Sequence, residues 1–117
     1  MVVWLCTGDR RLSKKALAEI DAGGDLRISP MVLLELQYLK EIGRLKPDSE
    51  WWLMILERDF GVTTCPIPFL WITKVALAET WTRDPFDRII VAQAKAAGGK
   101  LLTSDEHIHA NFPGAIW

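Results

Sequence analysis

Strand-like and helical segments alternate along this chain, and this alternation constrains the fold more than any other feature. Residues 26–28 are an extended apolar segment that leads into Ser29-Pro30, an N-cap followed by proline at the first helical position. Residues 100–103 lead in the same way into a short helix that starts at Ser104. Strands separated by helices in this order are typical of an α/β domain whose mainly parallel sheet is covered on both faces. We therefore predict a three-layer α/β/α fold.

Periodicity and helix-ending residues give the other elements. Apolar residues recur at helical spacing after Ser13 and after Asp48, and Gly23 and Gly61 end these two segments. Pro68 ends an extended segment, and Asp84-Pro85 starts a further helix. The predicted helices are 14–22, 30–42, 48–59, 71–81, 85–97 and 104–111, and the predicted strands are 26–28, 62–67, 100–103 and 115–117.

Length and composition exclude several classes of protein. The 117 residues, half of them apolar, predict a single domain over residues 1–117. A net charge of −1 lacks the basic excess of proteins that coat nucleic acid, so any contact with nucleic acid must be local. No apolar run approaches the roughly 20 residues of a membrane span. The two cysteines, Cys6 and Cys65, are too few for a disulfide framework or a zinc site. We expect a soluble, cytoplasmic protein.

Glu35 lies within an otherwise apolar helical segment, with Met31 and Tyr38 on its own helical face. At least part of this carboxylate should be shielded from water. A shielded carboxylate is costly unless it is paired, hydrogen-bonded or bound to metal. The alternative is that the helix simply exposes one polar edge here.

Asp84 and Asp87 flank Pro85-Phe86 at the start of a predicted helix. Asp84 fits an N-cap, and Asp87 could merely favour the positive helix end. Because one cap suffices, Asp87 is free to emerge at the end of the sheet. We expect Arg88 to form a surface ion pair with Asp84, with a contact to phosphate as the alternative.

Asp105 follows the predicted strand 100–103 after one residue, at the carboxyl edge where ligands bind in α/β folds. Thr103 or Ser104 could cap the next helix, which would leave Asp105 free. Three carboxylates on separate elements suit a hard cation such as Mg²⁺ or Mn²⁺. Glu35, Asp87 and Asp105 are therefore candidate ligands of a catalytic metal ion.

Three segments of the chain together resemble a known family. PIN domains, particularly the VapC-like toxins of bacterial toxin–antitoxin pairs, are similar in these segments: Ile28-Ser29-Pro30 leading to Leu33-Leu34-Glu35-Leu36, then Arg83-Asp84-Pro85-Phe86-Asp87-Arg88-Ile89-Ile90-Val91-Ala92-Gln93-Ala94, then Leu101-Leu102-Thr103-Ser104-Asp105. The order and spacing of the last two segments are the specific part of the resemblance.

The resemblance implies an endoribonuclease that uses Mg²⁺ or Mn²⁺ to hydrolyse RNA phosphodiesters. In it, Glu35, Asp87 and Asp105 match three of the family's acidic residues, and Thr103 matches its accompanying hydroxyl. Asp84 matches an additional acid of the subgroup. The resemblance also implies a homodimer and a cognate antitoxin that blocks the enzyme.

One departure from the family concerns its first strand, which is central in the sheet and ends in an Asp. That strand and its Asp have no counterpart here, so we expect the domain to be truncated at its N-terminus and its activity to be impaired. Residues 2–6 have strand-like composition and could replace the strand, bringing Asp9 towards the site.

Two other functions are alternatives to ribonuclease activity. The first is a catalytically silent PIN-like binding module that acts through dimer or antitoxin contacts, with Trp51, Trp52 and Trp81 as candidate contact residues. The second is a nucleotide-binding domain, which is disfavoured because Gly23-Gly24 and Gly98-Gly99 do not form a G-x-G-x-x-G turn.

Overall fold

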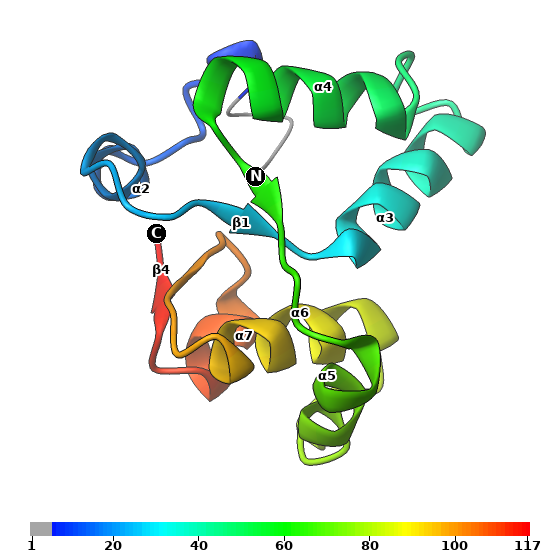
Figure 1. The fold of residues 1–117 in the computed structure, drawn as a ribbon, viewed down its shortest axis with the longest axis vertical. Helices are drawn as coiled ribbons and strands as arrows, with labels where there is room; N and C mark the ends of the chain where they lie inside the picture. The colour runs from blue at the N-terminus through cyan, green and yellow to red at the C-terminus, as the bar shows by residue number, and fades with distance from the viewer. Residues whose placement is uncertain (1–5) are drawn as a thin grey trace.

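A computed structural model describes residues 6–117, which alternate between helices and short strands (Figure 1). The helices are α2 (Lys14–Asp21), α3 (Pro30–Glu41), α4 (Ser49–Phe60), α5 (Phe69–Ala76), α6 (Pro85–Ala96) and α7 (Glu106–Asn111). The strands are β1 (Arg27–Ile28), β2 (Thr63–Thr64), β3 (Leu101–Leu102) and β4 (Ala115–Ile116). The predicted order of elements is confirmed, although every strand is shorter than predicted. Among the described residues, no helix is long and apolar enough to cross a membrane.

The strands form two separate parallel pairs. β1 pairs with β2, with Arg27 opposite Thr63, and β3 pairs with β4, with Leu101 opposite Ala115. The predicted parallel pairing is therefore confirmed, and the chain has the predicted α/β class. Within residues 6–117, however, the pairs are not joined into one continuous sheet.

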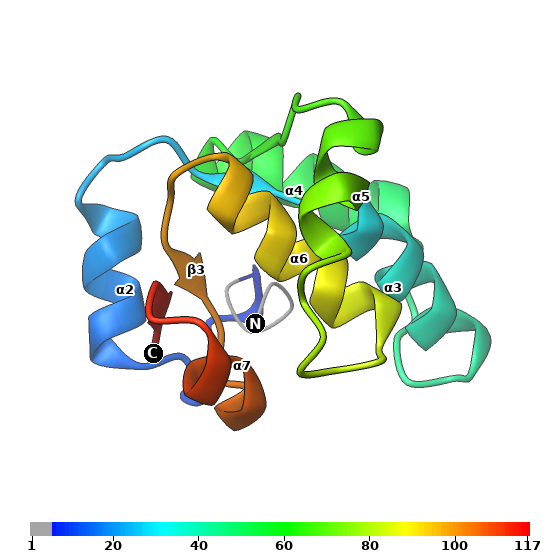
Figure 2. The ribbon, with the colours of Figure 1, turned by 90° about the horizontal axis from the view of Figure 1, so that it is seen from below.

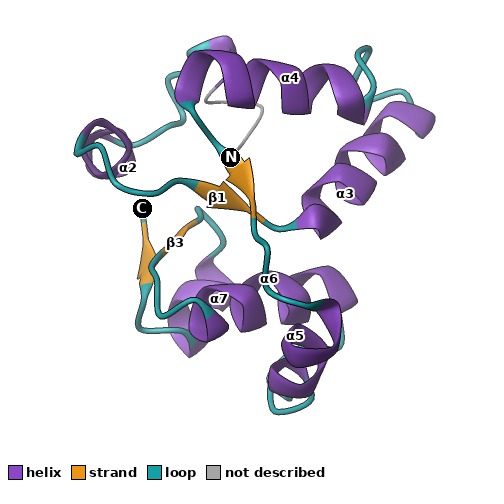
Figure 3. Ribbon diagram, in the orientation of Figure 1, coloured by secondary structure: helices purple, strands orange, loops and turns teal. Residues whose placement is uncertain are grey.

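Helices cover the strand pairs from two sides, as the predicted three layers require. On one side a core of Leu12, Ala16, Leu56 and Val62 joins α2 and α4 to residues of both strand pairs. On the other side α5 packs along α6, and α7 packs against α6 through Val91 and Ile108 (Figures 1 and 2). In Figure 3 the short strands lie between α2 and α4 on one side and α5, α6 and α7 on the other.

The helix boundaries follow local capping. Ser29 and Asp84 cap their helices as predicted, and Ser13 and Asp48 do the same: each side chain accepts a hydrogen bond from a backbone N–H in the first turn of the next helix. The helix predicted over residues 71–81 is shifted: α5 starts at Phe69, directly after Pro68, and ends at Ala76. It ends early because residues 77–81 turn so that Glu79 can be buried against α6, where Lys95 contacts it.

Gly61 ends α4 in the left-handed region, with φ at 64°. A methyl group added there meets no atom within 4 Å, so the cost of an alanine is purely conformational. We expect Gly61→Ala to lower the free energy of unfolding by about 1 kcal/mol, measured by urea denaturation. Gly24→Ala is the matched control, since Gly24 has open space and no positive φ. An equal loss in both variants would contradict the capping argument.

Candidate metal centre

The three candidate carboxylates, which come from separate elements, all line one cavity of about 380 Å³, as does the ion pair of Asp25 with Arg27. Glu35 comes from the middle of α3, Asp87 from the first turn of α6, and Asp105 from the residue that caps α7. The cavity also contacts residues of β1 and β3, and Thr103 lies at its rim after β3. Folding thus brings together side chains that are up to 70 positions apart in the sequence (105 − 35).

Asp87 has a strongly perturbed acidity. Burial raises its pKa first, and the negative charges of Asp84, Asp105 and Glu35 add to this effect, so that the pKa is raised to about 6. His107 acts in the opposite direction. A positive charge at the site would relieve the repulsion between Asp87 and the neighbouring carboxylates.

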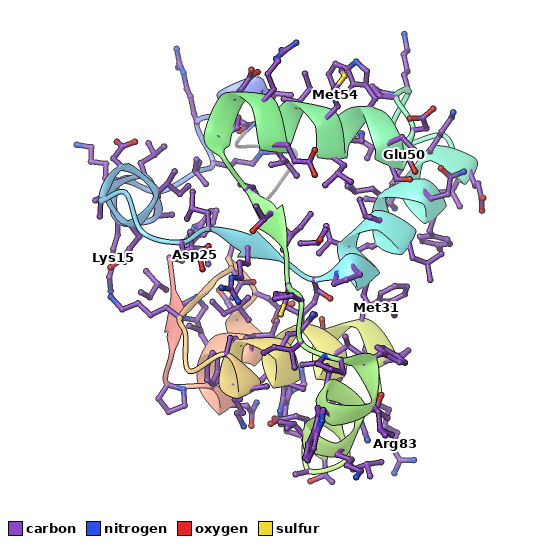
Figure 4. The ribbon with its side chains drawn as sticks, in the orientation of Figure 1. Lys15, Asp25, Met31, Glu50, Met54 and Arg83 are labelled. Atoms are coloured by element: carbon purple, nitrogen blue, oxygen red, sulfur yellow. The ribbon has the colours of Figure 1, made fainter. Side chains whose placement is uncertain are left out.

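Glu35 shows the same trend. Its side chain is half-buried, and burial raises its pKa, with a further contribution from the charge of Asp84. The sequence-based expectation of a partly shielded carboxylate at Glu35 is therefore confirmed. Met31, on the same helical face, is half-buried at the start of α3 (Figure 4).

Asp105 serves as the N-cap of α7, because its Oδ1 accepts a hydrogen bond from the Ile108 backbone N–H at 2.9 Å. The expectation that the Thr103 or Ser104 hydroxyl would cap this helix is wrong. Instead, Thr103 Oγ1 accepts a hydrogen bond from the Asp105 backbone N–H at 3.2 Å. The two residues thus fix each other's position, and one oxygen of Asp105 is committed to the helix.

Asp84 caps α6 as predicted, with its Oδ1 accepting from the Phe86 N–H at 2.8 Å. The surface ion pair expected between Arg88 and Asp84 does not form among the described residues. Arg88 Nε donates instead to the carbonyl oxygen of Thr82 at 2.7 Å. This bond holds the loop before α6 against the half-buried Arg88 of the helix, while Oδ1 of Asp84 is engaged in the cap. Arg83 lies at the edge of the molecule beside α5 (Figure 4).

Asp9 lies outside the site, because an ion pair with Arg11 at 2.8 Å holds its side chain and it does not line the cavity. The prediction that residues 2–6 replace the missing strand falls outside the described residues, except that Cys6 is helical. His107 of α7 is exposed and was not among the site residues expected from the sequence, yet it lies close enough to Asp87 to affect its pKa. Its position two residues after Asp105, in the first turn of α7, is the sequence feature that could have identified His107 as a neighbour of the site.

The donor chemistry of the site fits a hard divalent cation. Its side chains present carboxylate oxygens and a threonine hydroxyl, and their mutual repulsion would be relieved by such an ion. Within residues 6–117, however, no three acidic, cysteine or histidine side chains lie close enough together to enclose a metal. The site is thus an open set of carboxylates rather than a closed cage.

The raised pKa of Asp87 predicts a pH-dependent stability. A carboxyl group whose pKa is higher in the folded state stabilises the fold below its unfolded pKa, and this contribution is lost as the pH rises through about 6. In metal-free buffer, Asp87→Asn should therefore become more stable than the wild type as the pH rises from 4 to 8. After solvent screening we expect a gain of about 1 kcal/mol, measured by urea denaturation. A pH-independent difference between the two proteins would contradict the assignment, and Asp21→Asn, an exposed substitution, is the control.

Comparison with known proteins identifies the family to which this chain belongs. The model of the PIN domain family matches residues 1–112. The chain is also 30% identical, over 122 aligned positions, to the protein named Ribonuclease VapC22 of Mycobacterium tuberculosis (strain ATCC 25618 / H37Rv). That alignment covers 97% of this chain and 91% of the relative. No solved structure matches the chain significantly. The family match over nearly the whole chain, together with the identity to a VapC protein, shows that the chain belongs to the PIN-domain family.

Proposed function

We propose that this protein is a divalent-metal-dependent endoribonuclease of the toxin–antitoxin type, which hydrolyses RNA phosphodiesters. The observation that carries the proposal is that Glu35, Asp87 and Asp105 line one cavity, where burial and the charges of Asp84, Asp105 and Glu35 raise the pKa of Asp87 to about 6. Membership of the PIN family and similarity to a protein named a ribonuclease support the same assignment.

In this proposal Glu35, Asp87 and Asp105 hold Mg²⁺ or Mn²⁺. When bound, the ion supplies polarised water and neutralises charge on the scissile phosphodiester. The chain's own residues position the ligands: Thr103 fixes the backbone of Asp105, and Asp84 fixes the first turn of α6 that carries Asp87. Arg88 keeps the preceding loop in place through Thr82.

The open arrangement of the carboxylates predicts weak metal binding by this chain. Adding Mn²⁺ at millimolar concentration should raise Tm by a few degrees, because an ion that binds only the folded state stabilises it. Asp105→Asn should remove most of this rise while preserving the helix cap, since asparagine also caps helices well. The experiment is differential scanning fluorimetry with and without EDTA.

Asp21→Asn is the matched control for the metal-binding experiment, because Asp21 is exposed and does not line the cavity. It should keep the full Tm rise with Mn²⁺. The same rise in all three proteins would mean that the ion binds elsewhere, and the proposed ligand set would then be abandoned.

The proposal includes protein partners as well as RNA. Helix α5 and the residue after it expose large apolar side chains, with Phe69 64% and Leu77 70% exposed, next to Leu70 and Trp71. Surfaces of this kind mark protein contacts, and they fit both a homodimer and a cognate antitoxin. Trp51 is also exposed, whereas Trp52 is buried in the core of α4.

The same surface supports a second candidate, a catalytically silent binding module acting through these contacts. The two functions are separated by incubating the purified chain with RNA and Mn²⁺. Cleavage that EDTA abolishes supports the ribonuclease. Stable partner binding without any cleavage, at full occupancy by the metal, supports the silent module.

A further inference from the structure

Two aromatic rings lie in contact beside the candidate metal centre. The ring centroids of Trp81 and His107 are 5.2 Å apart, and the planes of the two rings meet at 84°. This edge-to-face arrangement is one in which aromatic rings attract each other. Trp81 belongs to the segment between α5 and α6, whereas His107 belongs to the first turn of α7. The contact therefore forms only when distant parts of the chain pack together.

Trp81 is held in place by contacts of its own. Its Nε1 donates a hydrogen bond to Oε2 of Glu79 at 2.6 Å, and the Glu79 side chain is only 3% exposed. The other carboxylate oxygen of Glu79 pairs with Lys95 of α6. The Trp81 ring also packs against the apolar core that α6 and α7 share. It is thus a fixed support for the ring of His107.

His107 offers an aromatic face to the surroundings of the protein. It is exposed, whereas Trp81 is half-buried. Because the two rings are nearly perpendicular, Trp81 covers at most one face of the imidazole, whichever ring presents its edge. At least one face of His107 is therefore not covered by Trp81. The other histidine of α7 is engaged differently, since Nε2 of His109 donates to the carbonyl oxygen of Thr103 at 2.7 Å.

The imidazole of His107 lies next to the candidate metal ligands. Asp105, two residues before it, caps α7 and lines the cavity. Burial and neighbouring carboxylates raise the pKa of Asp87, and His107 is near enough to act against this rise. A phosphodiester held at these carboxylates carries a nucleoside on either side. One of the two nucleobases therefore comes within reach of the imidazole.

Charge alone gives RNA little affinity for this cavity. In the described part of its lining the basic side chains are Arg27 and Lys100, and each is already paired with a carboxylate. The three candidate metal ligands repel phosphate until a cation neutralises them. Binding of RNA here needs a contribution that does not depend on charge, and stacking of a base on an aromatic side chain supplies one.

We propose that the uncovered face of His107, supported by Trp81, is the subsite for an unpaired nucleobase next to the phosphodiester that is hydrolysed. The proposal rests on the ribonuclease function proposed above. Bases within a duplex have no free face, so the substrate is single-stranded at this position. His107 touches the base and not the reacting phosphate, so it determines affinity for RNA. Purines stack more strongly than pyrimidines and are preferred.

The test measures binding of a fluorescently labelled oligoadenylate of about 12 nucleotides to the full chain by fluorescence anisotropy. Millimolar Ca²⁺ replaces Mn²⁺ to relieve the carboxylate repulsion, and a denaturing gel checks that the RNA stays intact. We expect His107→Ala to raise Kd about tenfold. The salt dependence of Kd should not change, because no phosphate contact is lost. Equal affinity of the two proteins for oligoadenylate would overturn the proposal.

Two further RNAs test the role of the base. An abasic oligomer of the same length keeps the phosphates and should bind the wild type and His107→Ala equally. The same oligoadenylate paired with oligouridylate should bind more weakly, and His107→Ala should not change its Kd. If the wild type bound the abasic oligomer as tightly as oligoadenylate, no base would be recognised and the subsite would be abandoned.

Replacements of His107 separate stacking from charge. His107→Phe keeps an aromatic face without a charge and should bind oligoadenylate like the wild type. His107→Lys keeps a positive charge without an aromatic face and should bind as weakly as His107→Ala. The opposite order would mean that His107 contacts a phosphate, which overturns the proposal. His109→Gln is the matched control: it removes the other imidazole of α7, keeps a donor for the Thr103 carbonyl and should leave Kd unchanged.

Failure of this subsite is distinguishable from failure of the ribonuclease assignment. Cleavage of RNA by the wild type, with equal Kd for the wild type and His107→Ala, would remove the subsite and leave the ribonuclease in place. A Kd that depends on His107, without any cleavage in Mn²⁺, would uphold the subsite in a chain that binds RNA but does not hydrolyse it.

Discussion

Asp87→Asn should lower the rate of Mn²⁺-dependent RNA cleavage by about a hundredfold or more, because loss of a charged group at a catalytic metal costs several kcal/mol of transition-state stabilisation. Asp87 is the carboxylate on which the fields of Asp84, Asp105 and Glu35 converge. Asparagine preserves the size of the side chain and the first turn of α6. The measurement is cleavage of a labelled RNA at saturating Mn²⁺.

Asp87→Asn should change RNA cleavage and stability in opposite directions. The same substitution that removes cleavage should leave the metal-free fold at least as stable above pH 6, since it removes a repulsive charge. Loss of activity cannot then be attributed to unfolding. Asp59→Asn, an exposed site paired with Arg58, is the control and should retain full activity. Undiminished cleavage by Asp87→Asn would point to a contaminating nuclease.

Glu79→Ala should cause the largest loss of stability that we predict, about 2–3 kcal/mol. The Glu79 side chain is 3% exposed, and its Oε2 accepts a hydrogen bond from Trp81 Nε1 at 2.6 Å. Its other oxygen pairs with Lys95 of α6. Removing the carboxylate leaves the Trp81 N–H without its acceptor and leaves the loop after α5 unanchored. Urea denaturation measures the effect.

Glu79→Gln separates the contribution of the ion pair with Lys95 from that of the hydrogen bond with Trp81. It keeps an acceptor for Trp81 but loses the ion pair, so we expect about half the loss of the alanine variant. Glu57→Gln, on the exposed face of α4, is the matched control and should stay within about 0.5 kcal/mol of the wild type. Equal stability of Glu79→Gln and Glu57→Gln would show that the ion pair contributes nothing.

The pH dependence of this network has the opposite sign to that of Asp87. Burial raises the pKa of Glu79, but the hydrogen bonds from Lys95 and Trp81 outweigh it, and the pKa is lowered. The stability from Glu79 is therefore present above its unfolded pKa and is lost as the pH falls through the lower folded value. Acid should weaken the α5–α6 connection while it relieves the repulsion at Asp87.

The sequence by itself determined the elements whose ends depend on neighbouring residues. Ser29-Pro30 and Asp84-Pro85 start helices because a capping oxygen and a fixed φ act within one turn. The acidic residues of the candidate site were also identifiable, because Glu35 interrupts an apolar helical segment and Asp87 and Asp105 stand near the starts of helices. The cap of α7 was predicted at Thr103 or Ser104 but is Asp105, because all three neighbouring side chains carry an oxygen that can accept the N–H of a first helical turn.

Only the tertiary structure decided how these pieces act together. Burial and long-range repulsion raise the pKa of Asp87, and the charges responsible lie on three different elements. The burial of Glu79 shortens α5, although the sequence of residues 77–81 continues in a helical pattern. The pairing of β1 with β2 and of β3 with β4 likewise depends on contacts between distant segments. Local signals specify where elements begin and end, whereas electrostatic fields and strand edges exist only once distant segments have packed together.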